Sequence, residues 1–206
     1  MGVYLCMSTG LVVVTIFTKS LYNERLVYWR EAASGANRLA YFLAKNFTDL
    51  EATVLNTLVF TSAFVFVAAP AGTFADYFIT IFLYQYCLVA IAYICSWIPP
   101  YPTLLAVIVA LVSGLGTGGS QSIKDMGPLG TIQWARWFGE GQYILELREE
   151  FIYPAYRAHL RETLDKVYTY DLDNFQMDLI AMFIIGCVLR LIGYLFLVGT
   201  NREKQK

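Results

Sequence analysis

Long, uninterrupted apolar runs alternate with polar segments along this chain. Five runs stand out, at residues 2–18, 52–71, 76–97, 102–117 and 177–199. A helix needs about 20 apolar residues to cross the hydrocarbon core of a bilayer, and the run at 102–117 is the one short member. Transmembrane β-strands would show short alternating segments instead. The pattern predicts an all-α, polytopic helical membrane protein with about five transmembrane helices.

Composition supports a membrane setting rather than a soluble globular domain. Apolar residues make up 57% of the chain, charged residues 15%, and the mean hydropathy is +0.51. The alternative, helices buried in the core of a large soluble protein, is disfavoured because the runs reach membrane-spanning length and the stretches 52–71 and 77–99 carry no charged residue. We interpret residues 1–206 as a single transmembrane domain.

Basic residues near the ends of the runs predict the orientation. The loop 19–51 and the C-terminal tail are rich in them: Lys19, Arg25, Arg30, Arg38, Lys45, Arg202, Lys204 and Lys206. The positive-inside rule places both segments in the cytoplasm. The long loop 118–176 is then extracellular. Its aromatic segment 134–143 favours short helices that dip into the outer leaflet, and a folded extracellular cap remains the alternative.

A charged segment with interspersed aromatic residues, 24–35, lies inside the predicted cytoplasmic loop. If it is helical, Leu26, Val27, Trp29 and Arg30 lie on partly overlapping faces. Such a segment favours a contact surface for both polar and apolar partners. The alternative is an amphipathic helix that lies on the inner leaflet with Trp29 as its anchor.

The chain offers little for catalysis. Its single histidine, His159, stands in the predicted extracellular loop with no second histidine or cysteine nearby to complete a metal site. The glycine-rich run 114–120 is not followed by the Lys-Ser or Lys-Thr of a phosphate-binding loop. The four cysteines all fall in apolar runs and are interpreted as core residues. We therefore predict no catalytic residue, no metal and no cofactor in this chain.

Arg190 is a basic residue well inside an apolar run. A charge at that depth costs several kcal/mol unless it is paired, hydrated or snorkels to the surface. It lies nine residues before Gly199, about 13 Å along a helix, so snorkelling would be strained. A buried partner is the sharper hypothesis. Asp178, near the outer end of the same run, is interpreted as interfacial.

Several residue groups follow one another in an order known from a transporter family. They are Glu24-Arg25, Arg30-Glu31, Ser34-Gly35, Tyr41-Phe42-Leu43-Ala44-Lys45, Ser113-Gly114, Glu150-Phe151, Arg190 and Asn201-Arg202. This order resembles the membrane domain of G-subfamily ABC transporters of the White or pleiotropic-drug-resistance type, in a variant similar to the plant and protist branch. The resemblance covers nearly the whole chain, from the family's second transmembrane helix to its sixth. The family's nucleotide-binding domain and first helix are absent from this sequence.

The resemblance implies specific roles for individual residues. The segment 24–35 would be a coupling helix that contacts the ATPase domain, through Glu24, Arg25, Trp29, Arg30 and Glu31. A substrate cavity would lie between two subunits, with Thr9, Val12 and Val13 facing Thr103, Val107 and Ala110. Leu115 would form an apolar valve. The cavity residues suit a hydrophobic ligand, and they equally suit plain packing of one helix on another.

These expectations describe the permeation part of an ATP-driven exporter of hydrophobic or amphipathic compounds such as lipids, sterols and drugs. ATP and Mg²⁺ would bind the nucleotide-binding domain, outside this chain. Expected partners are the lipid bilayer, that domain, a second transporter subunit and a hydrophobic small molecule, with no nucleic acid. The expected location is the plasma membrane. The alternative is a non-transporting scaffold or assembly partner, whereas a channel would need a polar ring that the runs lack.

Overall fold

The computed structural model of the chain describes residues 2–70, 72–98, 101–118, 132–147 and 173–199, without the side chains of 2–7 and 113–118. The described residues are helical and contain no strand, which confirms the all-α prediction. The helices are α1 (Gly2–Ala33), α2 (Arg38–Ala68), α3 (Phe74–Ser96), α4 (Pro102–Gly118), α7 (Trp134–Leu147) and α9 (Phe175–Gly199).

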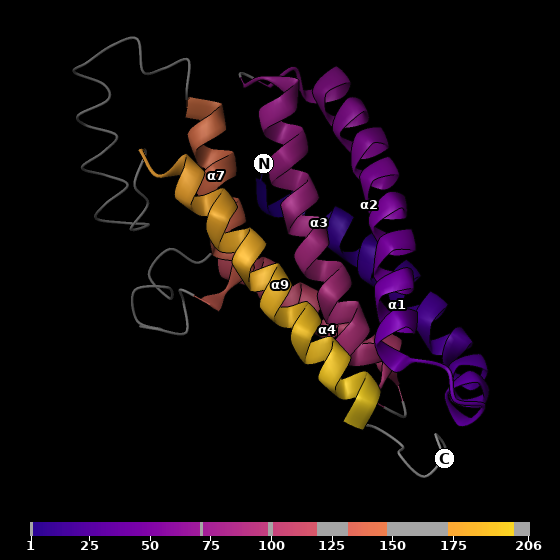
Figure 1. Cartoon of the computed structure of the whole chain (residues 1–206). Coiled ribbons are helices and arrows are strands. Elements are labelled where there is room, and N and C mark those ends of the chain that lie inside the picture. The colour runs from indigo at the N-terminus through magenta and orange to yellow at the C-terminus, as the bar shows by residue number, and fades with distance from the viewer. Residues whose placement is uncertain (1, 71, 99–100, 119–131, 148–172, 200–206) are drawn as a thin grey trace.

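Helix α3 lies at the centre of the bundle and is buried on nearly all sides. It packs against α1, α2, α4, α7 and α9, and Figure 1 shows it between α2 on one side and α9 on the other. Apolar residues cover its whole circumference, a pattern typical of helices that other helices enclose. Its largest fully buried side chains are Tyr77, Ile81, Tyr84, Gln85, Leu88 and Tyr93.

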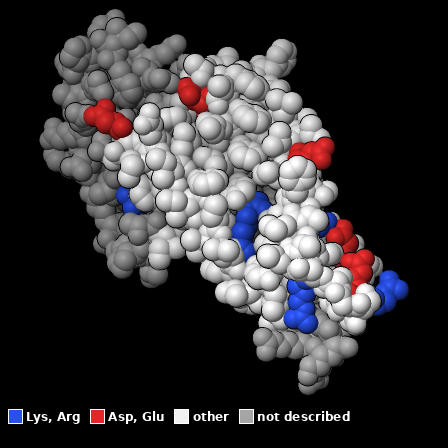
Figure 2. Space-filling model, viewed as in Figure 1, with Lys and Arg blue, Asp and Glu red and all other residues white. Residues whose placement is uncertain are grey.

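Three described helices, α2, α3 and α9, are long and apolar enough to cross a membrane. Helices α2 and α9 turn many large apolar side chains outward, among them Phe66, Val67 and Leu195. Figure 2 shows a largely uncharged surface on this face, with a basic side chain near its middle and most of the other visible Lys and Arg toward the lower right. The chain is thus a polytopic helical membrane protein. The predicted spans 2–18 and 102–117 include residues whose side chains are not described, so the count of five crossings stays a prediction.

The predicted cytoplasmic loop 19–51 is mostly helical. Helix α1 continues through the charged segment to Ala33, and α2 begins at Arg38, well before the predicted span 52–71. The expected coupling helix is therefore not a separate element, because it forms the last turns of α1. Hydropathy marks where a helix enters hydrocarbon, whereas Glu, Arg, Lys and Leu all favour helix outside it.

A tight turn at residues 34–37 joins α1 to α2. Gly35 has φ +94°, a left-handed conformation that glycine adopts without steric cost. The Ala36 N–H donates to the Glu31 carbonyl at 3.0 Å, which closes α1 with a Schellman-type bond. The Asn37 side-chain oxygen accepts from the Leu39 N–H at 2.9 Å and caps the start of α2. Both helix ends are therefore satisfied within a four-residue connection.

A stripe of threonines attaches α2 to α3. Thr53, Thr57 and Thr61 recur every four residues and are fully buried. The Gln85 side-chain oxygen on α3 accepts hydrogen bonds from Thr57 Oγ1 at 3.0 Å and from Asn56 Nδ2 at 3.1 Å. Small hydroxyl residues let helices approach closely in a membrane, and polar contacts between them fix the register.

Glycines bring α9 against α3 at close range. The buried face of α9 consists of Asp178, Met182, Gly186, Arg190, Gly193 and Leu197. A Cβ atom at Gly186 would lie 2.4 Å from the Tyr86 ring, and one at Gly193 would lie 3.1 Å from the Tyr93 Cβ. A side chain at Gly186 would displace the Tyr86 ring, and one at Gly193 would press on Tyr93. The two glycines therefore set the spacing between the two helices.

Gly186→Ala should destabilise the protein because its methyl group must displace the Tyr86 ring. Overpacking of this kind typically lowers the free energy of unfolding by about 1–3 kcal/mol. Thermal unfolding in detergent micelles, followed by tryptophan fluorescence, would show a lower Tm. Gly199→Ala is the matched control, since nothing lies within 4 Å of its added methyl. Equal Tm values for the two variants would contradict this account of the α3–α9 contact.

Candidate functional site

A chain of charged side chains joins α1 to α2 near their shared turn. Lys45 Nζ lies 2.9 Å from Glu24 Oε1 and 3.6 Å from Asp49 Oδ1. Lys45 also donates to Ser20 Oγ at 3.2 Å. The Lys45 and Asp49 side chains are 13% and 6% exposed, so both are largely removed from solvent. A cation that bridges two carboxylates at such a site lowers the free-energy cost of burying either one.

Helix α3 extends this network into the bundle core. The Tyr93 hydroxyl donates to Asp49 Oδ2 at 2.6 Å, and both residues are buried. One carboxylate oxygen of Asp49 thus accepts a hydrogen bond from the Tyr93 hydroxyl, and the other oxygen faces Lys45. A charge-assisted hydrogen bond of this kind is stronger than a neutral one. The contact fixes α2 against α3 at one height.

Arg190 reaches the same region from α9 and is 8% exposed. Its Nη1 donates to Asn46 Oδ1, and the Asn46 amide nitrogen donates to the Phe42 carbonyl at 2.8 Å. The guanidinium carbon lies 3.9 Å from the Tyr86 ring centroid, within cation–π range. Arg190 therefore has two partners inside the chain, Asn46 and the Tyr86 ring, and both are half-buried.

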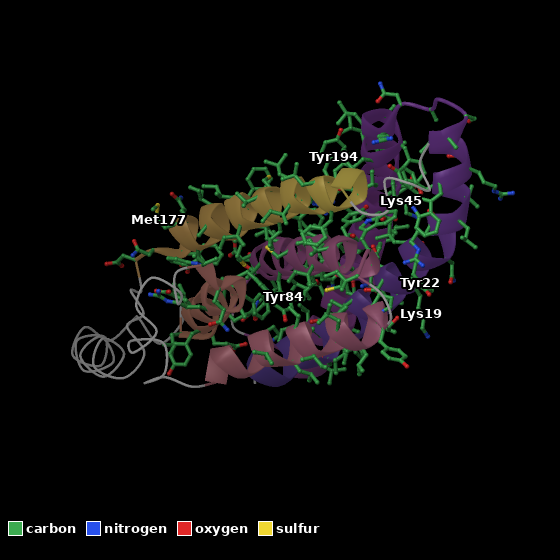
Figure 3. The ribbon with its side chains drawn as sticks, turned by 90° about the horizontal axis from the view of Figure 1, so that it is seen from below. Lys19, Tyr22, Lys45, Tyr84, Met177 and Tyr194 are labelled. Atoms are coloured by element: carbon green, nitrogen blue, oxygen red, sulfur yellow. The ribbon has the colours of Figure 1, made fainter. Side chains whose placement is uncertain are left out.

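Together these residues form a polar cluster, defined here as Ser20, Glu24, Lys45, Asn46, Asp49, Tyr86, Tyr93 and Arg190. Figure 3 places Lys45 near the end of the bundle that holds Lys19, Tyr22 and Tyr194, opposite Met177. The cluster carries two acidic and two basic side chains, so its formal charges cancel. It draws on α1, α2, α3 and α9, and it ties four helices together at one end.

Aromatic rings hold the exposed end of α1 against its neighbours. Tyr28 is 1% exposed, with its ring centroid 4.8 Å from that of Tyr41 on α2. It also lies 5.4 Å from the ring of Trp97, in an edge-to-face arrangement, just after α3. Such pairs add about 0.5–1.5 kcal/mol beyond burial. We call Tyr28, Tyr41 and Trp97 the aromatic joint.

The predicted coupling residues divide into two groups. Glu24 pairs with Lys45, while Arg25 lies 4.7 Å from the ring centroids of both Tyr22 and Trp29. Trp29 is 7% exposed, so its ring packs within the protein instead of anchoring in a leaflet. These three residues hold the end of α1 in place.

Arg30 and Glu31 form the second group and are exposed on the last turns of α1. A depression of about 550 Å³ lies beside them, lined by Leu26, Trp29, Arg30 and Ala33. The spacing of these four residues places them on one face of the helix. This end of α1 therefore offers an apolar recess next to exposed charges.

The predicted cavity residues do not share one surface. Thr9, Val13 and Ala110 are buried, whereas Val12 is 53% exposed. Thr103 and Val107 on α4 are half-buried. Helices α1 and α4 pack side by side, so the buried members contribute to packing within this chain. The assignment of the cavity between two subunits stays a prediction.

Some of the other predicted residues lie outside the part of the chain that the structure describes. The side chain of Leu115 and all of His159 lie outside the described residues. Helix α7 lies within the predicted extracellular loop 118–176 and carries the aromatic segment 134–143. Asp178 is fully buried near Gly141, because α7 covers that end of α9; its interfacial depth stays a prediction. Among described residues no group of three or more His, Cys, Asp or Glu could hold a metal.

Sequence reasoning missed most of the polar cluster. Lys45 entered the sequence analysis as a basic loop residue and as part of the family resemblance, and Asp49, Asn46 and Tyr93 were not singled out. A signal does exist: Lys45 and Asp49 are four residues apart and continue into the threonine stripe on the same face of α2. Their partners on α1, α3 and α9 are distant in sequence. Those pairings therefore required the structure.

Comparison with known proteins adds a family match and several relatives. A family described as ABC-2 type transporter matches residues 3–203. The chain is 28% identical over 187 residues to white-brown complex homolog protein 30 of Arabidopsis thaliana, covering 90% of this chain and 17% of that protein. It is 31% identical over 121 residues to ABC transporter G family member 28 of Arabidopsis thaliana, covering 58% and 11%.

A third relative, ABC transporter G family member 25 of Oryza sativa subsp. japonica, is 39% identical over 75 residues, covering 36% of this chain and 8% of that protein. The chain thus spans less than a fifth of the length of these relatives. No solved structure matches it.

Lys45→Met should destabilise the protein because it leaves the buried Asp49 carboxylate without its cation. Breaking a buried pair from one side costs about 3 kcal/mol, whereas removal of both partners is far less costly. The Tm in detergent should therefore fall for Lys45→Met and recover in part for Lys45→Met with Asp49→Asn. Lys19→Met is the control, because Lys19 is exposed and forms no ion pair with the described residues. A Tm loss of the same size in the control would argue against the cluster.

Proposed function

The chain belongs to the ABC-2 type transporter family, and from this premise we propose that it is the membrane-spanning part of an ATP-driven exporter. The proposed cargo is hydrophobic or amphipathic, such as lipids, sterols or drugs. The proposed coupling partner is an ATPase domain that binds ATP and Mg²⁺. The observation that carries the proposal is the continuity of α1, which runs without a break from the predicted span 2–18 to the exposed Arg30 and Glu31.

An ATPase domain would dock at the end of α1. The depression beside Arg30 offers an apolar recess for a side chain of that domain, and the exposed Arg30 and Glu31 offer charges of both signs. Interfaces commonly combine an apolar centre with a polar rim. The family match supports a partner domain of this kind, since ABC-2 membrane domains are the permease parts of ABC transporters.

Helix α1 would transmit movement as a lever. Its 32 residues span about 48 Å at helical rise, long enough to connect a docking site outside the bilayer with the membrane interior. The aromatic joint and the Glu24–Lys45 pair attach its end to α2 and α3. A push on Arg30 and Glu31 would therefore move α2 together with α1, instead of bending a loose loop.

The substrate route would lie on the outer face of α1 and α4, against a second subunit. Exposed apolar side chains follow both helices on the surface of this chain: Val12, Ile16, Leu104, Ile108 and Val112. A ligand bound against these apolar side chains would be recognised by its shape and hydrophobicity. We propose the plasma membrane as the location and either an identical or a related chain as the second subunit.

Substitution of Arg30 and Glu31 by Ala should uncouple the transporter without unfolding it. In the complete protein in lipid nanodiscs, sterols or amphipathic drugs should stimulate ATP hydrolysis. In the double variant this stimulation should be about fivefold weaker, a factor at the lower end of typical coupling between two sites, and the Tm should be unchanged. Glu24→Ala should lower both stimulation and Tm, because it also breaks the pair with Lys45.

Lys19→Ala provides the matched control, as an exposed basic residue on the same helix away from the depression. Normal stimulation in the double variant would contradict the docking site. If the complete protein hydrolyses no ATP under any ligand, the exporter proposal fails in favour of a non-transporting scaffold.

A further inference from the structure

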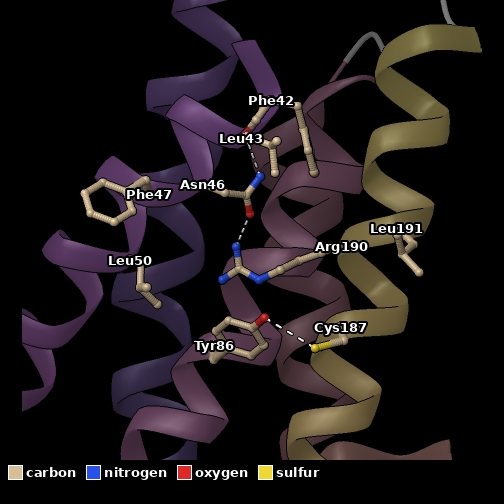
Figure 4. A pocket seen from close by; sticks show the side chains of 9 residues that line it. All are labelled: Phe42, Leu43, Asn46, Phe47, Leu50, Tyr86, Cys187, Arg190 and Leu191. Carbon is tan, nitrogen blue, oxygen red and sulfur yellow. Dashed lines mark hydrogen bonds between the residues drawn. The ribbon is translucent and has the colours of Figure 1, made fainter. Parts of the chain in front are cut away.

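A groove between α2 and α9 opens onto the uncharged face of the bundle, with Tyr86 of α3 at its floor. Its volume is about 450 Å³, within the range typical of small-ligand sites. Leu43, Phe47 and Leu191 on its walls are 58%, 75% and 65% exposed, so they face the surroundings of the chain. Figure 4 shows Arg190 in the middle of these residues, between Asn46 and Tyr86. The groove is thus an apolar slot with a cation at its base.

Arg190 is not fully satisfied by the protein. Its Nη1 is bonded to Asn46, whereas Nε and Nη2 have no hydrogen-bond partner among the described residues. Within the same part of the chain it forms no ion pair. A guanidinium that is 92% buried with two vacant donors is costly, and those donors match the geometry of an oxyanion. The groove therefore has a vacancy for a negative charge.

The Asn46 side of the groove lies near the headgroup region of one leaflet. Asn46 lies 22 residues before Ala68 at the far end of α2, about 33 Å at helical rise. The hydrocarbon core is about 30 Å thick, so Asn46 lies close to its boundary on the side of the α1–α2 turn. The charged pair of Lys45 and Asp49 lies at the same level of α2. Along α9, Arg190 lies nine residues before Gly199, about 13 Å at helical rise, so a phosphate bound there would be drawn inward along the groove from the headgroup level.

We propose that this groove binds one anionic glycerophospholipid from the leaflet on the side of the α1–α2 turn. Its phosphate would accept hydrogen bonds from Arg190 Nε and Nη2, and an acyl chain would lie along Leu43, Phe47 and Leu191. The acyl chain matches the apolar walls, which a free phosphate would leave uncovered. An anionic headgroup fits better than a zwitterionic one, because the latter brings a second cation near the guanidinium. The lipid would connect α2 to α9 where few direct contacts join them.

The test measures lipid retained by the complete protein, without nucleotide or transported ligand. Protein would be released from nanodiscs of phosphatidylcholine mixed with phosphatidylglycerol, and bound lipids would be counted by native mass spectrometry. The wild type should prefer phosphatidylglycerol about tenfold, the worth of one or two charge-assisted hydrogen bonds. Arg190→Gln and Leu191→Trp should abolish the preference, the first by removing the charge and the second by filling the groove.

Leu195→Trp is the matched control, because Leu195 lies one turn beyond Leu191, is also 65% exposed and does not line the groove. It should keep the full preference. If Arg190→Gln proves unstable, Leu191→Trp carries the test, since it leaves the contact between Arg190 and Asn46 intact. Retained preference in either groove variant, or loss in the control, would overturn the proposal.

Inorganic phosphate distinguishes a lipid site from a free-anion site. In phosphatidylcholine nanodiscs, millimolar phosphate should leave the Tm of the wild type unchanged, whereas phosphatidylglycerol should raise it. A rise with phosphate alone, together with displacement of phosphatidylglycerol, would overturn the lipid assignment. None of these readouts depends on transport, so failure here and failure of the exporter proposal are separable.

Discussion

The arrangement of the bundle depends on neutralising charge at one end of a buried helix. Helix α3 is enclosed by its neighbours. Those neighbours bring Glu24, Lys45, Asp49 and Arg190 toward its C-terminal half, which carries Tyr93. The two carboxylates both face Lys45, Asp49 also accepts the Tyr93 hydroxyl, and Arg190 donates to Asn46. Buried ion pairs seldom add much net stability, but each partner becomes costly once the other is removed. The four charged residues therefore act mainly as a constraint on helix register, because a shifted α2 would separate Lys45 from Glu24 and a shifted α9 would separate Arg190 from Asn46.

That constraint bears on the proposed mechanism. The same Lys45 that neutralises Asp49 in the core also holds Glu24 on α1, so the docking end of α1 and the interior of the bundle share one residue. The aromatic joint adds a second attachment about one turn further along α1. With two attachments a helix resists rotation as well as displacement. An ATPase domain that moved Arg30 would thus move a unit made of α1, α2 and the end of α3.

Sequence alone predicted the apolar helices because hydrophobic run length responds directly to the thickness of a bilayer. The predicted run 76–97 corresponds to α3 within two residues at its start, and 177–199 corresponds to α9 equally well. The helix bounds within the loop 19–51 were not predicted, because charge reports exposure to water and not the end of a helix. Neighbouring Val12 and Val13 were assigned to one cavity, yet helical rotation exposes one and buries the other. That Arg190 has a partner could be anticipated from the sequence. The identity of that partner, Asn46, could not, because it depends on α2 and α9 lying on either side of the groove above α3.

The enclosure of α3 also has a consequence for the order in which the protein is assembled. Chains enter the membrane from the N-terminus, so α3 is inserted before α9, the helix that covers its Tyr86 and Tyr93 face. Until then, α3 would present Tyr86, Cys87 and Tyr93 to lipid or to whatever escorts new helices. Its apolar circumference suits this interval, since it is apolar enough to remain in hydrocarbon without its final neighbours. The bundle is therefore completed only when α9 is inserted. A chain that stops before α9 would leave the Tyr86 and Tyr93 face of α3 uncovered.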